Sequence, residues 1–206
     1  MTKATQALHL PISWSSIGWT AILVAVVWMF ASCDKDEDAD PILTFVGDSE
    51  VELWDTKFFF PSYNTTNKGK SGAVLADIEK LENIAQGTYA IVILGTNDIP
   101  HLSSETIADY AERYVMALER LNGIRTFVFS IFPRGFEGEK SEANRLIRQL
   151  NTVVEQKCLS RSSFTYIDVY AALEKGDGIN PEYSFDGLHL SKQGYELITG
   201  ELKKKF

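Results

Sequence analysis

The sequence predicts an α/β domain in which parallel strands form one sheet with helices on both faces. Short apolar segments alternate with longer segments of helical periodicity, an order typical of a parallel sheet. The segment Ala90-Ile91-Val92-Ile93-Leu94 is apolar at every position, as expected of a central strand that is buried on both sides. Polar residues follow the expected strand ends, so we expect reactive side chains to gather beyond the carboxyl ends of the strands.

The strands and helices can be assigned in chain order from this pattern. The expected strands are residues 42–46, 63–67, 90–94, 126–132 and 164–169. The expected helices are a short one within 50–56, an amphipathic one over 74–81, one that begins near a cap at Ser103 and Ser104 and stops at Asn122-Gly123, one over 141–158, and a last one from a cap at Ser191 to Leu202. The five strands alternate with helices, which predicts a single sheet.

Length, charge and cysteine content limit the class of protein. A chain of 206 residues is long enough for one domain with a hydrophobic core. The formal net charge of −8 argues against a nucleic-acid partner that is bound through its phosphates. The two cysteines, Cys33 and Cys158, are too few for a disulfide framework or a cysteine-based zinc site. The count leaves open a disulfide between Cys33 and Cys158, although Cys158 is expected to be a small buried hydrophobic residue near a helix end.

The start of the chain has the composition of a targeting segment. Residues 1–32 carry one charged side chain, Lys3, and an apolar stretch over 17–30 that is shorter than the roughly 20 residues of a spanning helix. The sequence Phe30-Ala31-Ser32-Cys33 resembles the lipobox of bacterial lipoproteins. That resemblance implies a signal peptide over 1–32 and a lipid on Cys33, with an uncleaved anchor helix as the alternative.

An acidic segment separates this leader from the expected domain. Residues 34–40 are mostly Asp and Glu, which predicts a solvated linker within the segment 33–40 and a folded domain over 41–206. The acidic segment also resembles the export signal that some Gram-negative bacteria place after the lipidated cysteine of surface lipoproteins. Whether Cys33 carries a lipid or the leader remains as an anchor helix, we expect a domain that is tethered to a membrane and lies outside the cytoplasm.

A serine and a histidine from opposite ends of the domain carry the expected chemistry. Ser49 directly follows Gly47-Asp48, where the first strand ends, and a hydroxyl becomes a nucleophile only when a base takes its proton. His189 has Asp186 three residues before it in a glycine-containing loop, so a turn can bring the carboxylate to the imidazole. His101 has no such acid in its loop and is expected on the surface or lining a pocket. We therefore predict that Ser49, Asp186 and His189 meet.

Acyl transfer also requires hydrogen-bond donors that face the oxyanion of the tetrahedral intermediate. Candidate donors are the backbone N–H groups of Ser49 and Gly72 and the side-chain amide of Asn97. A glycine at position 72 permits close approach of the backbone to a ligand. The alternatives are that Gly72 only begins a helix and that Asn97 only forms a turn. Asp48 is expected to brace its own loop.

These residues together resemble a known family. Gly47-Asp48-Ser49, Ser71-Gly72, Gly95-Thr96-Asn97-Asp98 and Asp186-Gly187-Leu188-His189 resemble the four sequence blocks of the SGNH, or GDSL, hydrolases, in the family order. The resemblance implies Ser49 as nucleophile, His189 as base, Asp186 as its partner, and Gly72 and Asn97 as oxyanion donors. It implies no cofactor and no metal.

Within that family the chain looks most like the branch that contains the catalytic subunits of platelet-activating-factor acetylhydrolase. The segments Leu94-Gly95-Thr96-Asn97, Pro133-Arg134-Gly135 and Leu188-His189-Leu190 carry this likeness. It implies a three-layer, flavodoxin-like fold. One departure is Glu50, which stands where the motif has leucine and is expected to favour the imidazolium or to repel anionic substrates.

The expected function is hydrolysis of short acyl esters, acetyl above all, on a carbohydrate or similar small substrate. Two alternatives stay open: a lysophospholipase or thioesterase that uses the same mechanism, and a binding module on a retired hydrolase scaffold. The run Phe58-Phe59-Phe60 is expected to form a buried aromatic plug, with an acyl groove as the alternative.

Overall fold

The computed structural model describes residues 41–206 of the chain. The expected signal peptide, Cys33 and the acidic linker lie outside the described residues, so they stay predictions. Within residues 41–206, no helix has the length and apolar character needed to cross a bilayer.

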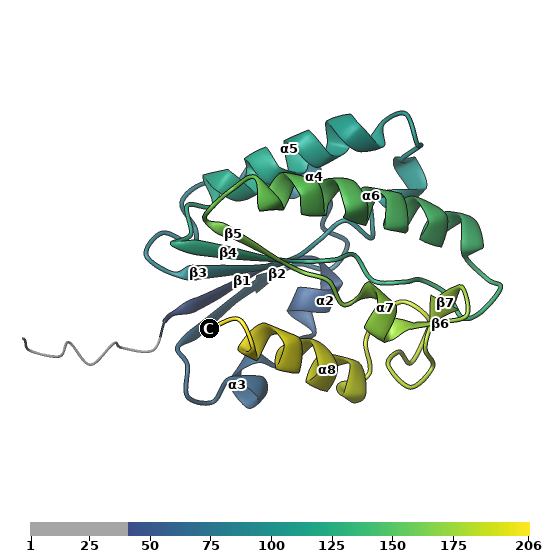
Figure 1. Cartoon of the computed structure of the whole chain (residues 1–206). Coiled ribbons are helices and arrows are strands. Elements are labelled where there is room, and N and C mark those ends of the chain that lie inside the picture. The colour runs from purple at the N-terminus through teal and green to yellow at the C-terminus, as the bar shows by residue number, and fades with distance from the viewer. Residues whose placement is uncertain (1–40) are drawn as a thin grey trace, which may run out of the picture. The chain divides into compact units, whose positions relative to one another are not determined.

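A five-stranded sheet forms the centre of the domain, as predicted. Its strands are β1 (Leu43–Gly47), β2 (Thr65–Gly69), β3 (Tyr89–Ile93), β4 (Arg125–Phe129) and β5 (Phe164–Ile167). All neighbouring strands are parallel, in the order β2-β1-β3-β4-β5 (Figure 1). This is the flavodoxin-like strand order, in which successive strands are added first on one side of β1 and then on the other, so that the strand order reverses between β1 and β3 and ligands bind in the crevice there.

Helices cover both faces of the sheet and complete the three layers (Figure 1). One face carries α4 (Leu75–Ile78), α5 (Ile107–Arg120) and α6 (Ser141–Leu159). The other carries α2 (Ser49–Glu52), α3 (Thr56–Phe59), α7 (Tyr170–Leu173) and α8 (Lys192–Lys203). A 3₁₀ turn, η1 (Ile99–His101), and a two-stranded antiparallel ribbon of β6 (Glu174–Lys175) and β7 (Gly178–Ile179), which the pattern did not predict, complete the fold.

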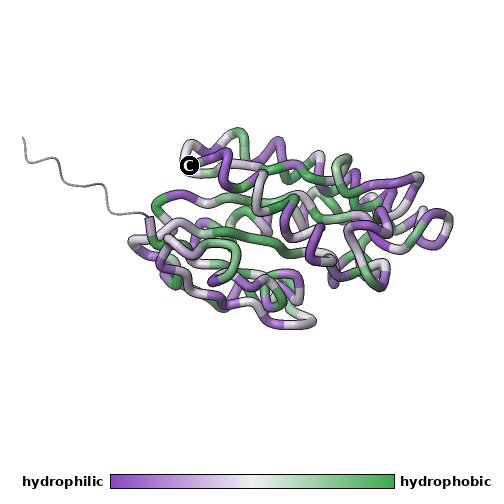
Figure 2. Tube along the Cα trace, turned by 90° about the horizontal axis from the view of Figure 1, so that it is seen from below, coloured by the Kyte–Doolittle hydropathy of each residue, from purple (hydrophilic) through white to green (hydrophobic). Residues whose placement is uncertain are grey.

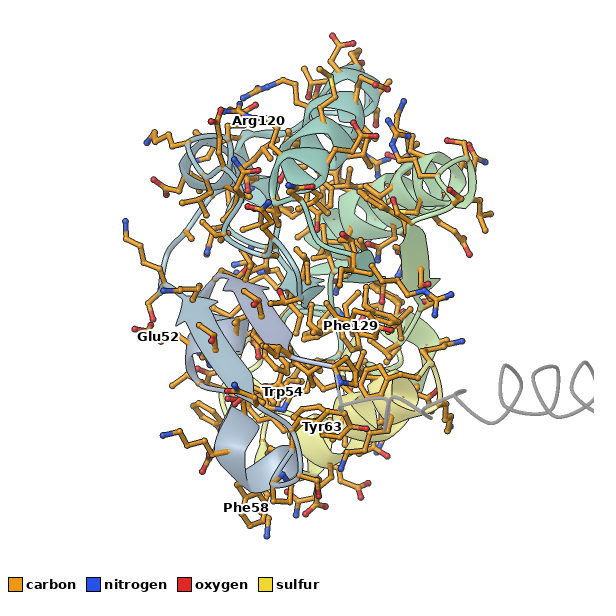
Figure 3. All side chains as sticks on the ribbon, turned by 90° about the vertical axis from the view of Figure 1, so that its left-hand side faces the viewer. Glu52, Trp54, Phe58, Tyr63, Arg120 and Phe129 are labelled. Atoms are coloured by element: carbon orange, nitrogen blue, oxygen red, sulfur yellow. The ribbon has the colours of Figure 1, made fainter. Side chains whose placement is uncertain are left out.

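The two faces of the sheet are packed with different side chains. Along β1, Phe45 points toward the layer of α2 and α8, and Val46 toward the layer of α5 and α6, as the two-residue period of a strand requires. The α8 side is rich in aromatic rings, and the centroid of Phe45 lies 5.1 Å from that of Trp54 and 5.4 Å from that of Phe60. Figure 3 shows Trp54 and Phe129 inside this layer, and Figure 2 shows the hydrophobic residues gathered along the central strands.

Two expected helix boundaries were wrong. The amphipathic segment over 74–81 forms only the single turn α4, because the N–H groups of Lys80 and Leu81 bond to carbonyls three residues before them rather than four. Helix α5 begins after Thr106 rather than at Ser103 or Ser104. The Thr106 hydroxyl accepts a hydrogen bond from the Ser103 N–H and donates one to the Ser103 carbonyl, so these residues close a separate turn before the helix.

The aromatic run in and after α3 is only partly a plug. Phe60 is buried against Phe45 and Trp54, as predicted. Phe58 is 58 % exposed, and the Lys192 ammonium lies 5.4 Å from its ring centroid, so the prediction of a buried ring was wrong for this residue. A one-turn helix can direct only part of a consecutive run of rings inward.

Candidate active site

Ser49 lies at a sharp corner between β1 and α2. Gly47 is the last residue of the strand, and only glycine fits there, because a Cβ would lie 1.8 Å from the carbonyl oxygen of Ile93 on the neighbouring strand β3. Asp48 then caps α2, and its Oδ1 accepts the N–H of Glu50 at 3.0 Å. The expectation that Asp48 braces its own loop is therefore confirmed. The corner leaves Ser49 only 7 % exposed, at the carboxyl end of a central strand.

The loop after the ribbon brings His189 to this corner. The Nε2 atom of His189 lies 3.1 Å from the Oγ of Ser49, and its Nδ1 lies 2.8 Å from Oδ2 of Asp186. The tautomer that satisfies both contacts donates from Nδ1 to the carboxylate and accepts the serine hydroxyl at Nε2. The two residues are 140 positions apart in the sequence, and the sheet brings them together.

Asp186 is held in its loop as an anion. Its Oδ1 accepts the backbone N–H groups of Leu188 at 2.9 Å and of His189 at 2.7 Å. Partial burial acts to raise the pKa of Asp186, but the hydrogen bonds from the side chain and backbone of His189 outweigh it and lower that pKa below its usual value. The carboxylate therefore stays charged at neutral pH, in the state that stabilises an imidazolium.

Gly72 and Asn97 come from the two loops that flank the corner. Gly72 follows β2 with a φ of +74°, which glycine adopts readily, and the space where a Cβ would stand is open. Asn97 follows β3, and its Nδ2 donates to the carbonyl oxygen of Ala73 at 3.0 Å. Since an amide nitrogen carries two hydrogens, one N–H of Asn97 is left for a ligand. The bond to Ala73 ties the Asn97 amide to the Gly72 loop.

Glu52 supports the same loop from α2. Its carboxylate accepts the N–H of Ser71 at 2.8 Å and also the Ser71 hydroxyl. These bonds lower the pKa of Glu52 below its usual value, so it remains an anion. The residue before Gly72 is thus bonded to the helix that begins at Ser49, a link that the sequence pattern did not predict.

Glu50 does not face the substrate side, contrary to expectation. Its side chain is turned inward and is 3 % exposed. Burial, and then the negative charge of Asp48, raise the pKa of Glu50 to about 8, and burial raises the pKa of Asp48 to about 7. A neutral, buried carboxyl neither repels an anionic substrate nor stabilises an imidazolium, so both expected roles of Glu50 were wrong at neutral pH.

Two further residues, His101 and Phe185, are exposed. His101, at the end of η1, is exposed, which agrees with the expected surface position. Phe185 is 66 % exposed, and its ring stacks on that of His189 with the centroids 5.9 Å apart and the planes 17° from parallel. Sequence reasoning missed Phe185, although an apolar residue next to Asp186 in a polar loop was a signal.

Sequence reasoning also missed the residues that hold the histidine loop. The Ser184 hydroxyl donates to the carbonyl of His189 at 2.8 Å and accepts the N–H of Gly187 at 2.9 Å. The N–H of Gly135 donates to the carbonyl of Gly187 at 2.6 Å, which joins this loop to the segment after β4. The Ser184 bonds are local to the loop, whereas the Gly135 bond depends on the tertiary fold, and serine and glycine in loops give no distinctive signal.

Comparison with known proteins identifies the family. Residues 52–197 match the GDSL-like lipase/acylhydrolase family. The chain belongs to this family. The matched segment begins just after Ser49, so the position of the serine beside His189 is known from the geometry described above.

Solved structures of family members share the fold. A structure from Streptococcus pneumonia that is named after platelet activating factor has a TM-score of 0.65 and 20 % identity, covering 90 % of this chain and 98 % of that one. A GDSL-like lipase from Bacteroides thetaiotaomicron has a TM-score of 0.65 and 18 % identity, covering 88 % and 95 % of the two chains. An acetyl xylan esterase from Geobacillus stearothermophilus has a TM-score of 0.60 and 15 % identity, covering 81 % and 94 %.

One curated relative is a larger protein. The chain is 24 % identical over 178 residues to an N-acylneuraminate cytidylyltransferase of Escherichia coli O18:K1:H7. The aligned part makes up 82 % of this chain and 42 % of that protein. The similarity therefore concerns less than half of the relative.

Proposed function

We propose that this protein is a serine esterase that removes short acyl groups, acetyl above all, from a carbohydrate or similar small substrate. The observation that carries the proposal is the chain of contacts from the Asp186 carboxylate through the His189 imidazole to the Ser49 hydroxyl. Such a chain lets an imidazole take the serine proton while a carboxylate orients the ring and stabilises its charge.

In the proposed reaction, Ser49 Oγ attacks the carbonyl carbon of the ester as its proton passes to Nε2 of His189. The negative oxygen of the tetrahedral intermediate accepts hydrogen bonds from the N–H groups of Ser49 and Gly72 and from the Asn97 amide. The C–O bond to the alcohol then breaks, and the imidazolium returns the proton to the leaving oxygen. A water molecule, deprotonated by His189, attacks the acyl-serine, which releases the carboxylic acid and restores Ser49.

The preference for a short acyl group rests on the space around Ser49. A small cavity of about 10 Å³ behind the corner is lined by Asp48, Glu50 and Leu188 among others, and it has room for no more than a water molecule. Four of the hollows on residues 41–206 have volumes of about 300–370 Å³, and none of these four is lined by Ser49, Asn97 or His189. A long acyl chain requires an apolar groove next to the nucleophile.

The carbohydrate part of the proposal rests on two weaker observations. Phe185 presents an exposed aromatic face beside His189, and a flat apolar surface of this kind suits the apolar face of a sugar ring. An acetyl xylan esterase is also among the similar structures. In the same proposal, a lipid on Cys33 would anchor the enzyme to a membrane outside the cytoplasm, with residues 34–40 as a spacer.

The test is hydrolysis of p-nitrophenyl acetate, butyrate and octanoate by the purified protein, with Ser49→Ala, His189→Ala and the control His101→Ala. We expect the highest kcat/KM for acetate and a loss of about 10³-fold or more in the first two variants. His101→Ala should retain activity because His101 is exposed and takes no part in the hydrogen bonds that join Ser49, His189 and Asp186.

Three outcomes would contradict the proposal in different ways. Activity that survives in both triad variants would remove Ser49 from the mechanism. A preference for octanoate would favour the lysophospholipase or thioesterase alternative. Folded protein that hydrolyses no ester and is not labelled by a fluorophosphonate probe would favour a retired binding module.

A further inference from the structure

The residue next to the nucleophile contacts the residue next to the base. Glu50 follows Ser49, and Leu190 follows His189. The Oε2 atom of Glu50 accepts the N–H of Leu190 at 3.3 Å. The hydroxyl of Tyr195, in α8, lies 2.9 Å from the backbone carbonyl oxygen of Glu50 and 3.2 Å from Oε2, and its one proton is shared between these two acceptors. One side chain therefore connects the helix of the nucleophile to two residues that follow the base, Leu190 and Tyr195.

We propose that Glu50 is a positioning residue which, as a neutral carboxylic acid, holds His189 at hydrogen-bond distance from Ser49. This proposal rests on the proposed esterase function. The short helix α2 has only one turn, and the His189 loop has no regular secondary structure, so neither element alone sets the distance between Ser49 and His189. The bond from Leu190 to Glu50 joins the two directly.

The surroundings of the second carboxyl oxygen require the neutral form. Within the described part of the chain, Oε1 of Glu50 and Oδ2 of Asp48 have no hydrogen-bond partner, and both residues line the cavity of about 10 Å³. A carboxylate would leave a buried charge without a donor at Oε1 and next to a second acid. A proton on Oε1 removes that charge and leaves Oε2 free to accept both of its hydrogen bonds.

Charged and titratable side chains from four different segments surround Glu50. Asp48 belongs to the same corner, Tyr195 to α8, and Asp186 to the histidine loop; the negative charges of Asp48 and Asp186 oppose ionisation of Glu50. Arg134, from the segment after β4, also lines the cavity, and its guanidinium donates to the carbonyl of Thr96. Burial is the largest cause that raises the pKa of Glu50, to about 8.

This assignment predicts an alkaline loss of activity. Above about pH 8, ionisation of Glu50 places an uncompensated charge in the cavity, and the contact with the histidine loop weakens. The free energy of unfolding should also fall at alkaline pH. The raised pKa of Glu50 stabilises the fold fully below the ordinary pKa of about 4.5, and this contribution is lost as the pH rises through about 8.

The experiment compares Glu50→Gln, Glu50→Leu, Tyr195→Phe and the control Glu196→Gln with the wild type from about pH 6 to pH 10. Glutamine mimics the neutral acid: its oxygen accepts from Leu190 and its amide replaces the protonated oxygen. Leucine retains apolar volume without an acceptor. Glu196 is an exposed acid on α8, with a side chain that is 55 % exposed. The readouts are kcat, KM and the rate at which a fluorophosphonate labels Ser49.

We expect Glu50→Gln to keep kcat at neutral pH within about twofold and to lack the alkaline fall. Glu50→Leu should lower kcat and the labelling rate by about 10- to 100-fold with little change in KM, because a small misplacement of a catalytic group has an effect of this size. Tyr195→Phe should move the alkaline fall to higher pH, since it removes a donor to the ionised form. Glu196→Gln should match the wild type.

Two results would overturn the proposal: Glu50→Leu as active as Glu50→Gln, or an alkaline fall in Glu50→Gln equal to that of the wild type. If Glu50→Leu does not fold, Tyr195→Phe decides, and an unshifted alkaline fall overturns the proposal. Wild-type protein that hydrolyses no ester yet is labelled at Ser49 would overturn the proposed function alone, because the labelling rates still test Glu50.

Discussion

The two halves of the candidate site are built in different ways. The Ser49 corner is made by the end of a central strand and the start of a helix, and it is almost fully buried. The His189 loop is more exposed, with 25 % of the His189 side chain and 39 % of the Asp186 side chain accessible to solvent. Core packing therefore holds the nucleophile, whereas a few polar contacts hold the base.

We therefore expect the stability and the activity of the domain to depend on different residues. Changes at the corner should lower stability, and with it every function of the domain. Changes in the loop should lower activity while most of the stability remains, because the loop contributes little apolar burial. Three variants test the contrast, in order of decreasing effect.

The largest effect is expected for Asp186→Asn in the loop. An amide accepts or donates in place of the carboxylate and no longer stabilises the imidazolium, so kcat should fall by about 10²–10⁴-fold with little change in KM. The melting temperature should change little because the side chain is partly exposed and an amide oxygen still accepts the two backbone N–H groups of the loop. Steady-state kinetics and thermal unfolding check this, with the exposed Glu182→Gln in the same loop as control. A kcat near that of the wild type would mean that Asp186 does not orient His189.

The next effect is expected for Gly47→Ala at the corner. The added methyl group would lie 1.8 Å from the Ile93 carbonyl oxygen, so β1 and β3 must separate, and we expect the free energy of unfolding to fall by about 3 kcal/mol or more. The matched control is Gly200→Ala in α8, where an added Cβ meets nothing within 4 Å, and a gain of about 0.5–1 kcal/mol is expected. Denaturant unfolding measures both. Equal stabilities would show that the corner is not held by close strand packing.

The smallest effect is expected for Ser184→Ala, which removes the hydroxyl between His189 and Gly187. The loss of two buried hydrogen bonds should lower the free energy of unfolding by about 1–2 kcal/mol. The activity should fall by about tenfold, since the carbonyl of His189 is no longer held. Ser162→Ala, an exposed serine before β5, is the control. Destabilisation without any loss of activity would show that Ser184 does not position the base.

Much of the site was predictable because its residues follow strand ends. Ser49 and Asn97 come directly after apolar segments, and the carboxyl ends of parallel strands share one edge of a sheet. Asp186 and His189 are close in sequence, so a local turn was enough to predict their contact. The strands were predicted to within a few residues because an apolar run between glycines and polar residues is a strong local signal.

The orientation of single side chains was not predictable in the same way. Glu50 was expected to act on the imidazolium or on anionic substrates, but α2 turns its side chain toward Tyr195, which lies 145 positions away in the sequence. Phe58 and Phe60 have the same chemistry and opposite burial, because α3 presents one ring to Trp54 and the other to solvent. The cap of α5 was misplaced since several hydroxyl residues compete for that role over residues 103–106.

The amino-acid sequence by itself determined the layered α/β fold, the family and the set of polar residues at the strand ends, because these depend on local periodicity and on motifs in a set order. The tertiary structure alone decided that Ser49 Oγ and His189 Nε2 lie 3.1 Å apart, that Gly135 is bonded to the histidine loop, and that Glu50 is buried. The physical reason is that each of these features is a contact between distant segments, which depends on how the helices pack on the sheet and not on any local preference of the chain.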